Sequence, residues 1–335
     1  MGDVAMTVPI VKTLAEQYPN VRITMLSKPF ARAFFENMPS NVGFMAADIK
    51  NEYRGVKGLN ALYRRLSAKH FTAIADLHDT LRSKYLCMRF NLNRNRVEHV
   101  NKHKHGKRLL TSQTKKRLCQ QPTAFQNYAD VFERLGYPIA PTFTSIFQDH
   151  TPDLTLLPDS ITPRQQGETW LGIAPFAAHN AKVYPPKYME EVIRQFSERK
   201  PNSRIFLFGA GKTENVQLNE WTEKFPNCHN ASALLGGLSN ELILMSQLDV
   251  MLSMDSANMH LASLVGTPVV SIWGATHPYA GFMGWQQSPD NVVQVDLSCR
   301  PCSIYGARPC FRGDYACLNS ISPEMVVAKI LNALA

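Results

Sequence analysis

A long hydrophobic run is the first thing that this 335-residue sequence lacks. No apolar stretch approaches the ~20 residues that a membrane-spanning helix requires, so we expect a soluble protein. The opening residues MGDVAMTVPIVKTLAEQYP also lack the basic lead and the small-residue cleavage site of a secretory signal, so we expect a cytoplasmic protein. With 44% hydrophobic and 19% charged residues, the composition is that of a globular chain, and the length favours two domains.

Two common nucleotide-binding signatures are missing as well. No G-x-G-x-x-G follows a predicted strand, which argues against a dinucleotide-dependent oxidoreductase. The stretch FLFGAGKTEN (206–215) resembles a P-loop, but that motif needs glycine where this chain has Phe206. We expect Gly209 and Gly211 to form a turn that admits a nucleoside, with Glu214 as an acceptor for the ribose hydroxyls.

Acidic residues are scarce in residues 94–117, which hold nine Lys or Arg against the single acid Glu98. This basic segment accounts for nearly all of the formal net charge of +9. It predicts an anionic partner, which could be nucleic acid, an acidic lipid surface or a phosphorylated ligand, and a solvated basic loop is the alternative. Nucleic acid is the weakest of these readings, because the segment lacks interleaved aromatic residues.

Seven cysteines are present, and four of them follow the spacing C-x2-C-x7-C-x6-C. In a cytosolic chain this pattern favours metal ligation or reduced thiols over disulfides. The first pair resembles half a zinc knuckle, but the second pair is split too widely for a repeated C-x2-C. Reduced structural thiols are therefore favoured and a zinc site stays open for Cys299, Cys302, Cys310 and Cys317.

Strand-like and helix-like segments alternate along the whole chain, which predicts an α/β protein with parallel sheets. The proline-containing segment 148–168 has no periodicity and is typical of a linker. We therefore expect two Rossmann-like domains facing across a cleft, at residues 1–160 and 161–335, with a last helix at 322–335 that could pack back on the first domain. The predicted strands are 21–27, 42–46, 71–77, 170–176, 203–209, 248–254 and 268–274; the predicted helices are 4–17, 29–36, 57–69, 123–135, 186–199, 214–225, 240–247 and 256–265.

The first domain is predicted to lack its first strand. A doubly wound domain normally begins with a buried strand, whereas this chain begins at the turn that would follow it, MGD. Either the start of the chain is misassigned or the chain is trimmed.

The most informative stretch is MDSANMHLASLVGTPVVSIWG (254–274). A strand ends at Met254, and Asp255 and Ser256 lie at the turn into a helix whose first N–H groups have no partner inside the helix, an arrangement that binds anions. Small Ala257 allows close approach of a ligand, and His260 follows about one turn later. Taken singly, Asp255 would be a helix cap and His260 a core histidine; together, at a strand end, they favour a diphosphate site.

Other strand ends add candidates for the same chemistry. Lys182, in the loop after strand 170–176, would bring a positive charge to the phosphates, and Thr276 follows the strand that ends near residue 274. In the first half, the strand end DLHDTLRSKYL (76–86) offers His78, Arg82 and Ser83 to an acceptor. Asp3, in the first turn of the first helix, is placed to take a proton from a substrate hydroxyl.

These residues resemble the ADP-heptose:lipopolysaccharide heptosyltransferases of glycosyltransferase family 9. Members of that family show GDVxxxxP near the start, DLHxxxRS in the first domain, a lysine followed by W/Y-P, and DSGxMHLAxxxGTPxVxxxGxTxP. The likeness covers essentially all of the chain, and the last block is its most specific part; Ala257 departs from the family's usual glycine. The matching residues are Gly2, Asp3 and Pro9, then Asp76, Leu77, His78, Arg82 and Ser83, then Lys182, Tyr184 and Pro185, and the block 255–278.

The resemblance implies a GT-B architecture and inverting transfer of heptose, or a related sugar, from an ADP-activated donor to the lipopolysaccharide inner core. It implies no cofactor and no catalytic metal, an anionic lipid-linked acceptor, and peripheral contact with the inner membrane surface. Asp3 is similar to the family's general base, and Lys182, Asp255, Ser256, Ala257 and His260 are similar to its donor-binding residues. The alternatives are a GT-B-type nucleotide-sugar epimerase, which would turn over donor without acceptor, and a non-catalytic protein that binds anions or nucleic acid through residues 94–117.

Overall fold

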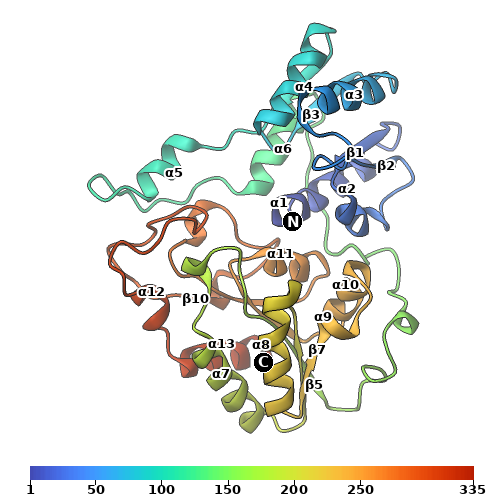
Figure 1. Cartoon of the computed structure of the whole chain (residues 1–335). Coiled ribbons are helices and arrows are strands. Elements are labelled where there is room, and N and C mark those ends of the chain that lie inside the picture. The colour runs from blue at the N-terminus through green and yellow to red at the C-terminus, as the bar shows by residue number, and fades with distance from the viewer. The chain divides into compact units, whose positions relative to one another are not determined.

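The computed structural model describes all 335 residues, and the chain forms two compact units (Figure 1). Apart from the first two residues, unit 1 comprises Asp3–His103 and Pro122–Gln148, and unit 2 comprises Lys104–Gln121 and Asp149–Ala335. None of the helices has the length and apolar character needed to cross a bilayer.

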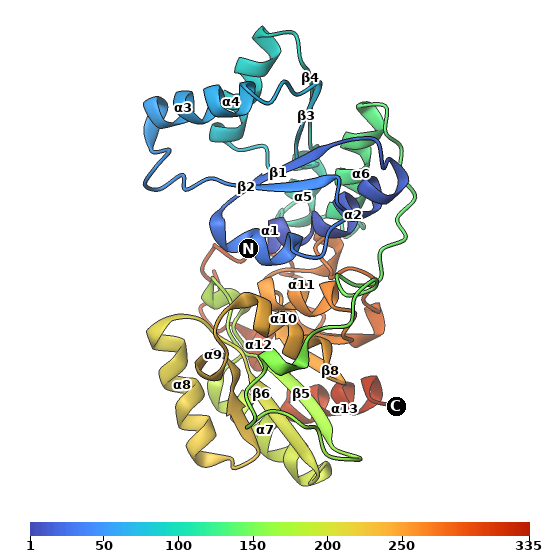
Figure 2. The ribbon, with the colours of Figure 1, turned by 90° about the vertical axis from the view of Figure 1, so that its right-hand side faces the viewer.

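Unit 2 is built on a six-stranded parallel sheet with the order β10-β9-β8-β5-β6-β7. The chain runs from β5 through β6 to β7 on one side, then returns to β8 beside β5 and continues through β9 to β10 on the other. Figure 2 shows β5 and β6 side by side. The strands are β5 (Thr169–Ala174), β6 (Ser203–Leu207), β7 (Cys228–Asn230), β8 (Val250–Met254), β9 (Val269–Ile272) and β10 (Val292–Val293).

The longer helices of unit 2 bury apolar side chains that recur at helical spacing. In α7, for instance, Met189, Val192, Ile193 and Phe196 are fully buried in the core of unit 2. The helices of unit 2 are α5 (Lys104–Leu110), α7 (Pro186–Arg199), α8 (Gly211–Lys224), α9 (Ala231–Leu234), α10 (Leu238–Ser246), α11 (Ala257–Leu264), α12 (Ala316–Asn319) and α13 (Pro323–Ala333).

Unit 1 contains two separate parallel two-stranded sheets, β1 with β2 and β3 with β4. Each strand of unit 1 therefore pairs with one neighbour only. The strands are β1 (Ile23–Ser27), β2 (Val42–Ala46), β3 (Ala73–Asp76) and β4 (Arg96–His99); the helices are α1 (Gly2–Ala5), α2 (Val8–Gln17), α3 (Gly55–Ser67), α4 (Leu81–Leu92) and α6 (Ala124–Arg134), with a 3-10 helix η1 (Pro29–Phe35).

All seven strands and most helices expected from the sequence are present within a few residues, which confirms the α/β class. The expected helix 4–17 is divided into α1 and α2 at residues 6–7, and the expected helix 29–36 is a 3-10 helix that begins at Pro29. The sequence analysis missed β4 and α5, which lie in the basic segment, where charge obscures the apolar pattern. It also missed β7, α9, β10 and α12, each of which has four residues or fewer.

The units divide differently from the predicted boundary at residue 160. Unit 2 begins at Asp149, and the excursion Lys104–Gln121 also belongs to it. Within unit 2 the backbone N–H of Gln121 donates to the carbonyl of Tyr279 at 2.9 Å, and the Nζ of Lys116 donates to the carbonyl of Pro301 at 3.1 Å. These bonds join a segment from the middle of the chain to loops near its end.

From the sequence, the last helix, α13, could pack back on the first domain. The structure instead places its buried side chains Val326, Val327 and Ile330 in the core of unit 2, where α13 packs against α7 and β9. Its apolar face is thereby accounted for without unit 1.

The two units should differ in local stability. Every residue of β8 is buried between two neighbouring strands, whereas every residue of β1 is partly exposed and has one neighbour. Local opening is easiest where few apolar contacts are lost, so amides of β1 and β3 should exchange with deuterium at least tenfold faster than those of β5 and β8. Exchange monitored by mass spectrometry measures this, and equal protection in both sets would contradict it.

Candidate functional site

The candidate ligand site of unit 2 lies at the carboxyl ends of β5 and β8. These neighbouring strands flank the point at which the chain reverses its direction across the sheet. In open α/β sheets such a switch point forms a crevice in which ligands bind. The loop after β5 carries Lys182, and the turn after β8 carries Asp255 and Ser256, so the topology brings together residues that are more than 70 positions apart in the sequence.

Lys182 and Asp255 form an ion pair, with Nζ and Oδ2 3.1 Å apart and side chains only 14% and 8% exposed. Lys182 ends a 3-10 turn (η3, Asn180–Lys182), and its aliphatic stem packs against Gly306. A Cβ on Gly306 would lie 2.5 Å from the Cγ of Lys182, so glycine is needed for this contact. The ammonium group is therefore fixed at the switch point.

The amino end of α11 points its first N–H groups into the turn after β8. Ser256 is the N-cap residue in an extended conformation (φ −144°, ψ −178°), but its hydroxyl does not cap the helix and instead lies 3.3 Å from the Oγ of Ser253. The N-terminal N–H groups of α11 thus have no side-chain cap, and the helix dipole favours an anion there. The next residue, Ala257, adds only a methyl group at this point.

His260 is buried but is not a satisfied core histidine. It is 7% exposed, and its Nδ1 has no hydrogen-bond partner. Burial, followed by the charge of Lys182, lowers the pKa of His260 to about 3, so the imidazole is neutral at physiological pH. Buried polar atoms in native proteins are nearly always paired, so the unpaired Nδ1, on the helix that follows Asp255 and Ser256, makes His260 a candidate contact for a bound group.

Thr276 shares this property, because its Oγ1 is also buried without a partner. The loop that carries it is held by Arg300, which is 3% exposed and donates to the carbonyl oxygens of Gly274 at 2.6 Å and of Trp273 and Thr276 at 3.0 Å each. The sequence analysis did not identify Arg300. Nothing in the residues around it signals that a guanidinium would be enclosed by backbone carbonyls.

Glu214 lies in the first turn of α8, at the carboxyl end of β6. Its Oε2 accepts a hydrogen bond of 2.7 Å from the backbone N–H of Ala210, so the carboxylate stabilises the turn that the glycines were predicted to form. A Cβ on Gly209 would lie 3.0 Å from Leu218 and 3.2 Å from the Oε2 of Glu214, which explains the glycine at this position. The role as a ribose acceptor stays a prediction.

In unit 1 the DLH motif forms a turn around Asp76. One oxygen, Oδ1, accepts the backbone N–H groups of His78 and Asp79 at 3.0 and 2.9 Å, and Oδ2 lies 3.1 Å from the Nδ1 of His99. Asp76, His99 and Cys87 are also the one group of three potential metal ligands whose atoms lie within 4.8 Å of one another. Burial, with the charges of Asp76 and Asp79, raises the pKa of the Cys87 thiol to about 12, so it stays protonated.

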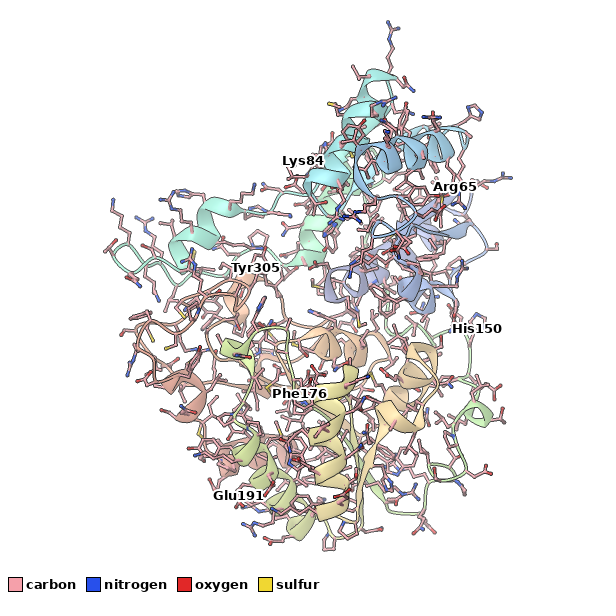
Figure 3. All side chains as sticks on the ribbon, viewed as in Figure 1. Arg65, Lys84, His150, Phe176, Glu191 and Tyr305 are labelled. Atoms are coloured by element: carbon pink, nitrogen blue, oxygen red, sulfur yellow. The ribbon has the colours of Figure 1, made fainter.

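The predicted acceptor residues occupy the turn after β3 and the start of α4. His78 and Arg82 are exposed, whereas Ser83 forms a reciprocal capping box with Thr80. A surface pocket of about 530 Å³ lies on the same helix but is lined by Asp79, Lys84, Met88, Asn91, Leu92 and His99. Figure 3 labels Lys84 on this helix. The sequence analysis missed Lys84 and His99, although Lys84 lies one residue beyond Ser83.

Asp3, the predicted base, is exposed in the first turn of α1, and its backbone carbonyl accepts a hydrogen bond of 3.4 Å from the hydroxyl of Tyr128. The four late cysteines, Cys299, Cys302, Cys310 and Cys317, are free thiols, and no three of their sulfur atoms lie within 4.8 Å of one another. They belong to a segment that is almost entirely irregular and carries Arg300 and Gly306.

Comparison with known proteins identifies one family. The model of "Glycosyltransferase family 9 (heptosyltransferase)" matches residues 59–308. The lipopolysaccharide core heptosyltransferase OpsX of Haemophilus influenzae is 24% identical over 300 residues, which cover 88% of this chain and 82% of that protein. The lipooligosaccharide heptosyltransferase 2 of Campylobacter jejuni is 27% identical over 174 residues, so the matched region spans 50% of this chain and only 52% of that relative.

Solved structures show the same fold. The ADP-heptose lipopolysaccharide heptosyltransferase II of E. coli superposes with a TM-score of 0.68 at 17% identity, covering 99% of this chain and 95% of that one. The E. coli heptosyltransferase WaaC with ADP gives a TM-score of 0.67 at 17% identity, covering 99% and 97%. A family 9 glycosyl transferase of Veillonella parvula gives 0.71 at 18% identity, covering 100% and 94%.

The contact between Gly306 and Lys182 can be tested with a matched pair of variants. Gly306→Ala and Gly313→Ala share the strain of an L residue at positive φ (+77° and +78°), but only Gly306 has Lys182 within 4 Å. Displacement of the ammonium should weaken binding of inorganic pyrophosphate about tenfold in Gly306→Ala and leave it within twofold in Gly313→Ala. Calorimetric titration of the two folded variants measures both affinities, and equal losses would place the effect in the backbone alone.

Proposed function

Since this chain belongs to glycosyltransferase family 9, the heptosyltransferase family, we propose that it transfers heptose or a related sugar, with inversion, from an ADP-activated donor to the lipopolysaccharide inner core. The observation that carries the proposal is the anion site at the switch point of unit 2, where Lys182 and the amino end of α11 meet. The relatives OpsX and WaaC are named as a lipopolysaccharide core heptosyltransferase and as a heptosyltransferase with ADP, which supports this donor and acceptor class.

In the proposed reaction the site of unit 2 stabilises the leaving ADP. As the bond between the anomeric carbon and the phosphate oxygen breaks, negative charge builds on the diphosphate. The ammonium of Lys182, the uncapped N–H groups of α11 and the hydroxyl of Ser256 are preorganised to receive that charge. Asp255 holds Lys182 in place through their ion pair, so its role is to position the cation.

Neutral His260 and Thr276 complete the donor site in this proposal. A histidine with a pKa of about 3 carries no charge at physiological pH, so its ring donates one hydrogen bond and accepts another without adding a second cation beside Lys182. The unpaired Nδ1 of His260 and the unpaired Oγ1 of Thr276 are the groups that a bound donor would satisfy. Glu214 would accept hydrogen bonds from the ribose hydroxyls while it holds its own turn.

The acceptor is assigned to unit 1. We propose that the exposed carboxylate of Asp3 takes the proton from the attacking hydroxyl, and that His78, Arg82 and Ser83 contact the acceptor. Of the nine cations of residues 94–117, three lie in unit 1 and six in unit 2, and we propose that together they attract the anionic acceptor at long range at the cytoplasmic face of the inner membrane. Lys182 and the dipole of α11 supply the positive charge that stabilises the leaving ADP. We therefore expect the transfer to proceed without a metal.

Loss of the base should abolish transfer without removing the donor. In an assay of ADP release from ADP-heptose with a Kdo-lipid acceptor, Asp3→Asn should lower kcat at least 100-fold, because a general base contributes 10²–10⁴-fold. Its affinity for ADP should stay within twofold of the unmodified protein. Asp159→Asn, which changes an exposed aspartate of unit 2, is the matched control and should keep full activity. Full transfer by Asp3→Asn would remove Asp3 from the mechanism.

The same assay separates the alternatives. Turnover of ADP-heptose in the absence of acceptor would favour a nucleotide-sugar epimerase. Undiminished transfer in the presence of EDTA is the expected result for a reaction that relies on Lys182, whereas a loss that Mg²⁺ restores would contradict the metal-free mechanism.

A further inference from the structure

The outward face of α4 is apolar. Leu81, Met88 and Leu92 are 89%, 50% and 73% exposed, and Leu81 and Leu92 are the two most exposed large hydrophobic residues of the chain. At about 100° per residue, spacings of seven and eleven positions place the three side chains within about 40° of one another on the helix surface. They lie on one face of α4 from its first residue to its last, with Lys84 and Tyr85 between Leu81 and Met88, and we term these three side chains the α4 stripe.

The α4 stripe is presented by a helix that is firmly held. The opposite face of α4 buries Leu86, Cys87 and Phe90, and Phe90 packs edge-on against Tyr63 of α3 with ring centroids 5.1 Å apart. The first turn is fixed by the capping box, and the hydroxyl of Tyr85 donates to Asn60 of α3 at 2.8 Å. Exposure of the stripe is therefore a property of a folded helix and does not arise from a frayed end.

Helix α4 and its neighbour α3 both carry cations and no carboxylates. α4 contains Arg82, Lys84 and Arg89, and α3 contains Lys57, Arg64 and Arg65; neither helix has an acidic residue. Figure 3 labels Lys84 on α4 and Arg65 on α3. Lys84 is half exposed. Its Nζ lies 3.0 Å from the Oδ1 of Asp79, which is in the turn that precedes α4. At its amino end α3 adds a further exposed apolar side chain, Val56.

We propose that the α4 stripe and its flanking cations dock unit 1 on a bilayer that contains anionic head groups. An amphipathic helix with an apolar stripe and a basic rim lies in the plane of the interface, with its apolar side chains among the acyl chains and its cations at the phosphates. An apolar face flanked by Arg82, Lys84 and Arg89, with the carboxylate of Asp79 neutralised in its ion pair with Lys84, complements an anionic lipid surface better than it complements a second copy of itself. This inference rests on the proposed function in one respect, because the proposed function supplies the reason for docking, which is a lipid-linked acceptor.

Sedimentation with lipid vesicles tests the docking without donor or acceptor. The full chain should bind vesicles of phosphatidylcholine with 30% phosphatidylglycerol at least tenfold more tightly than vesicles of phosphatidylcholine alone, since ~1 kcal/mol for each cation near the surface amounts to severalfold per residue. The variant Leu81→Ser/Met88→Ser/Leu92→Ser should bind the anionic vesicles at least tenfold more weakly. All three positions are exposed, so circular dichroism and the melting temperature should be unchanged.

Two further variants serve as controls. Leu154→Ser/Leu156→Ser removes two exposed leucines of unit 2, which are 39% and 52% exposed, and should leave vesicle binding unchanged. Lys57→Gln/Lys84→Gln should reduce the preference for phosphatidylglycerol and its dependence on salt, while the apolar contribution persists.

The proposal is overturned if the unmodified chain does not sediment with anionic vesicles, or if the serine triple variant binds them as well as the unmodified chain does. It is also overturned if sedimentation velocity shows a dimer that the triple variant abolishes, because the stripe would then be an interface between copies. An assay of transfer to a detergent-dispersed acceptor distinguishes failure of the docking proposal from failure of the proposed function. The triple variant should retain transfer to this acceptor whether or not the chain docks on a bilayer.

Discussion

The ion pair between Lys182 and Asp255 is the interaction on which the candidate ligand site of unit 2 depends. It joins the loops after β5 and β8, the two strands between which the chain changes direction. A lone ammonium so little exposed would be costly, and Asp255 offsets that cost while a ligand is absent. In the proposed complex the same ammonium would interact with both the carboxylate of Asp255 and the bound anion. Removal of Asp255 would therefore change both the position of Lys182 and its affinity for the anion.

Much of this arrangement is predictable from sequence because it follows from strand ends. Parallel strands place their carboxyl ends along one edge, so Lys182, Asp255, Ser256 and Thr276 could be grouped before any coordinates were known. Arg300 could not, because its partners are backbone carbonyls, which no residue pattern records. The unsatisfied state of His260 was equally hidden, since burial and the absence of a partner emerge only from packing.

Unit 1 was harder to predict for a different reason. Its first strand pair, β1 and β2, is short and partly exposed, and β4 lies within a segment dominated by charge, so periodicity gives little signal there. The contact between Asp76 and His99 could not be predicted from the sequence, because it depends on the pairing of β3 with β4. The exposed face of α4 could not be predicted either, because exposure is a property of the tertiary fold. From the sequence alone, Leu81, Met88 and Leu92 would be assigned to the core.

The excursion Lys104–Gln121 has a consequence for the covalent design of the molecule. The polypeptide leaves unit 1 after His103, returns at Pro122, and leaves again after Gln148, so it passes between the units three times in this region. Leu110, which is fully buried, lies within the excursion. A half-protein that ended at residue 148 would therefore carry this segment away from unit 2, and the remainder would lose the hydrogen bonds from Lys116 and Gln121. No single cut in the chain separates the two units cleanly.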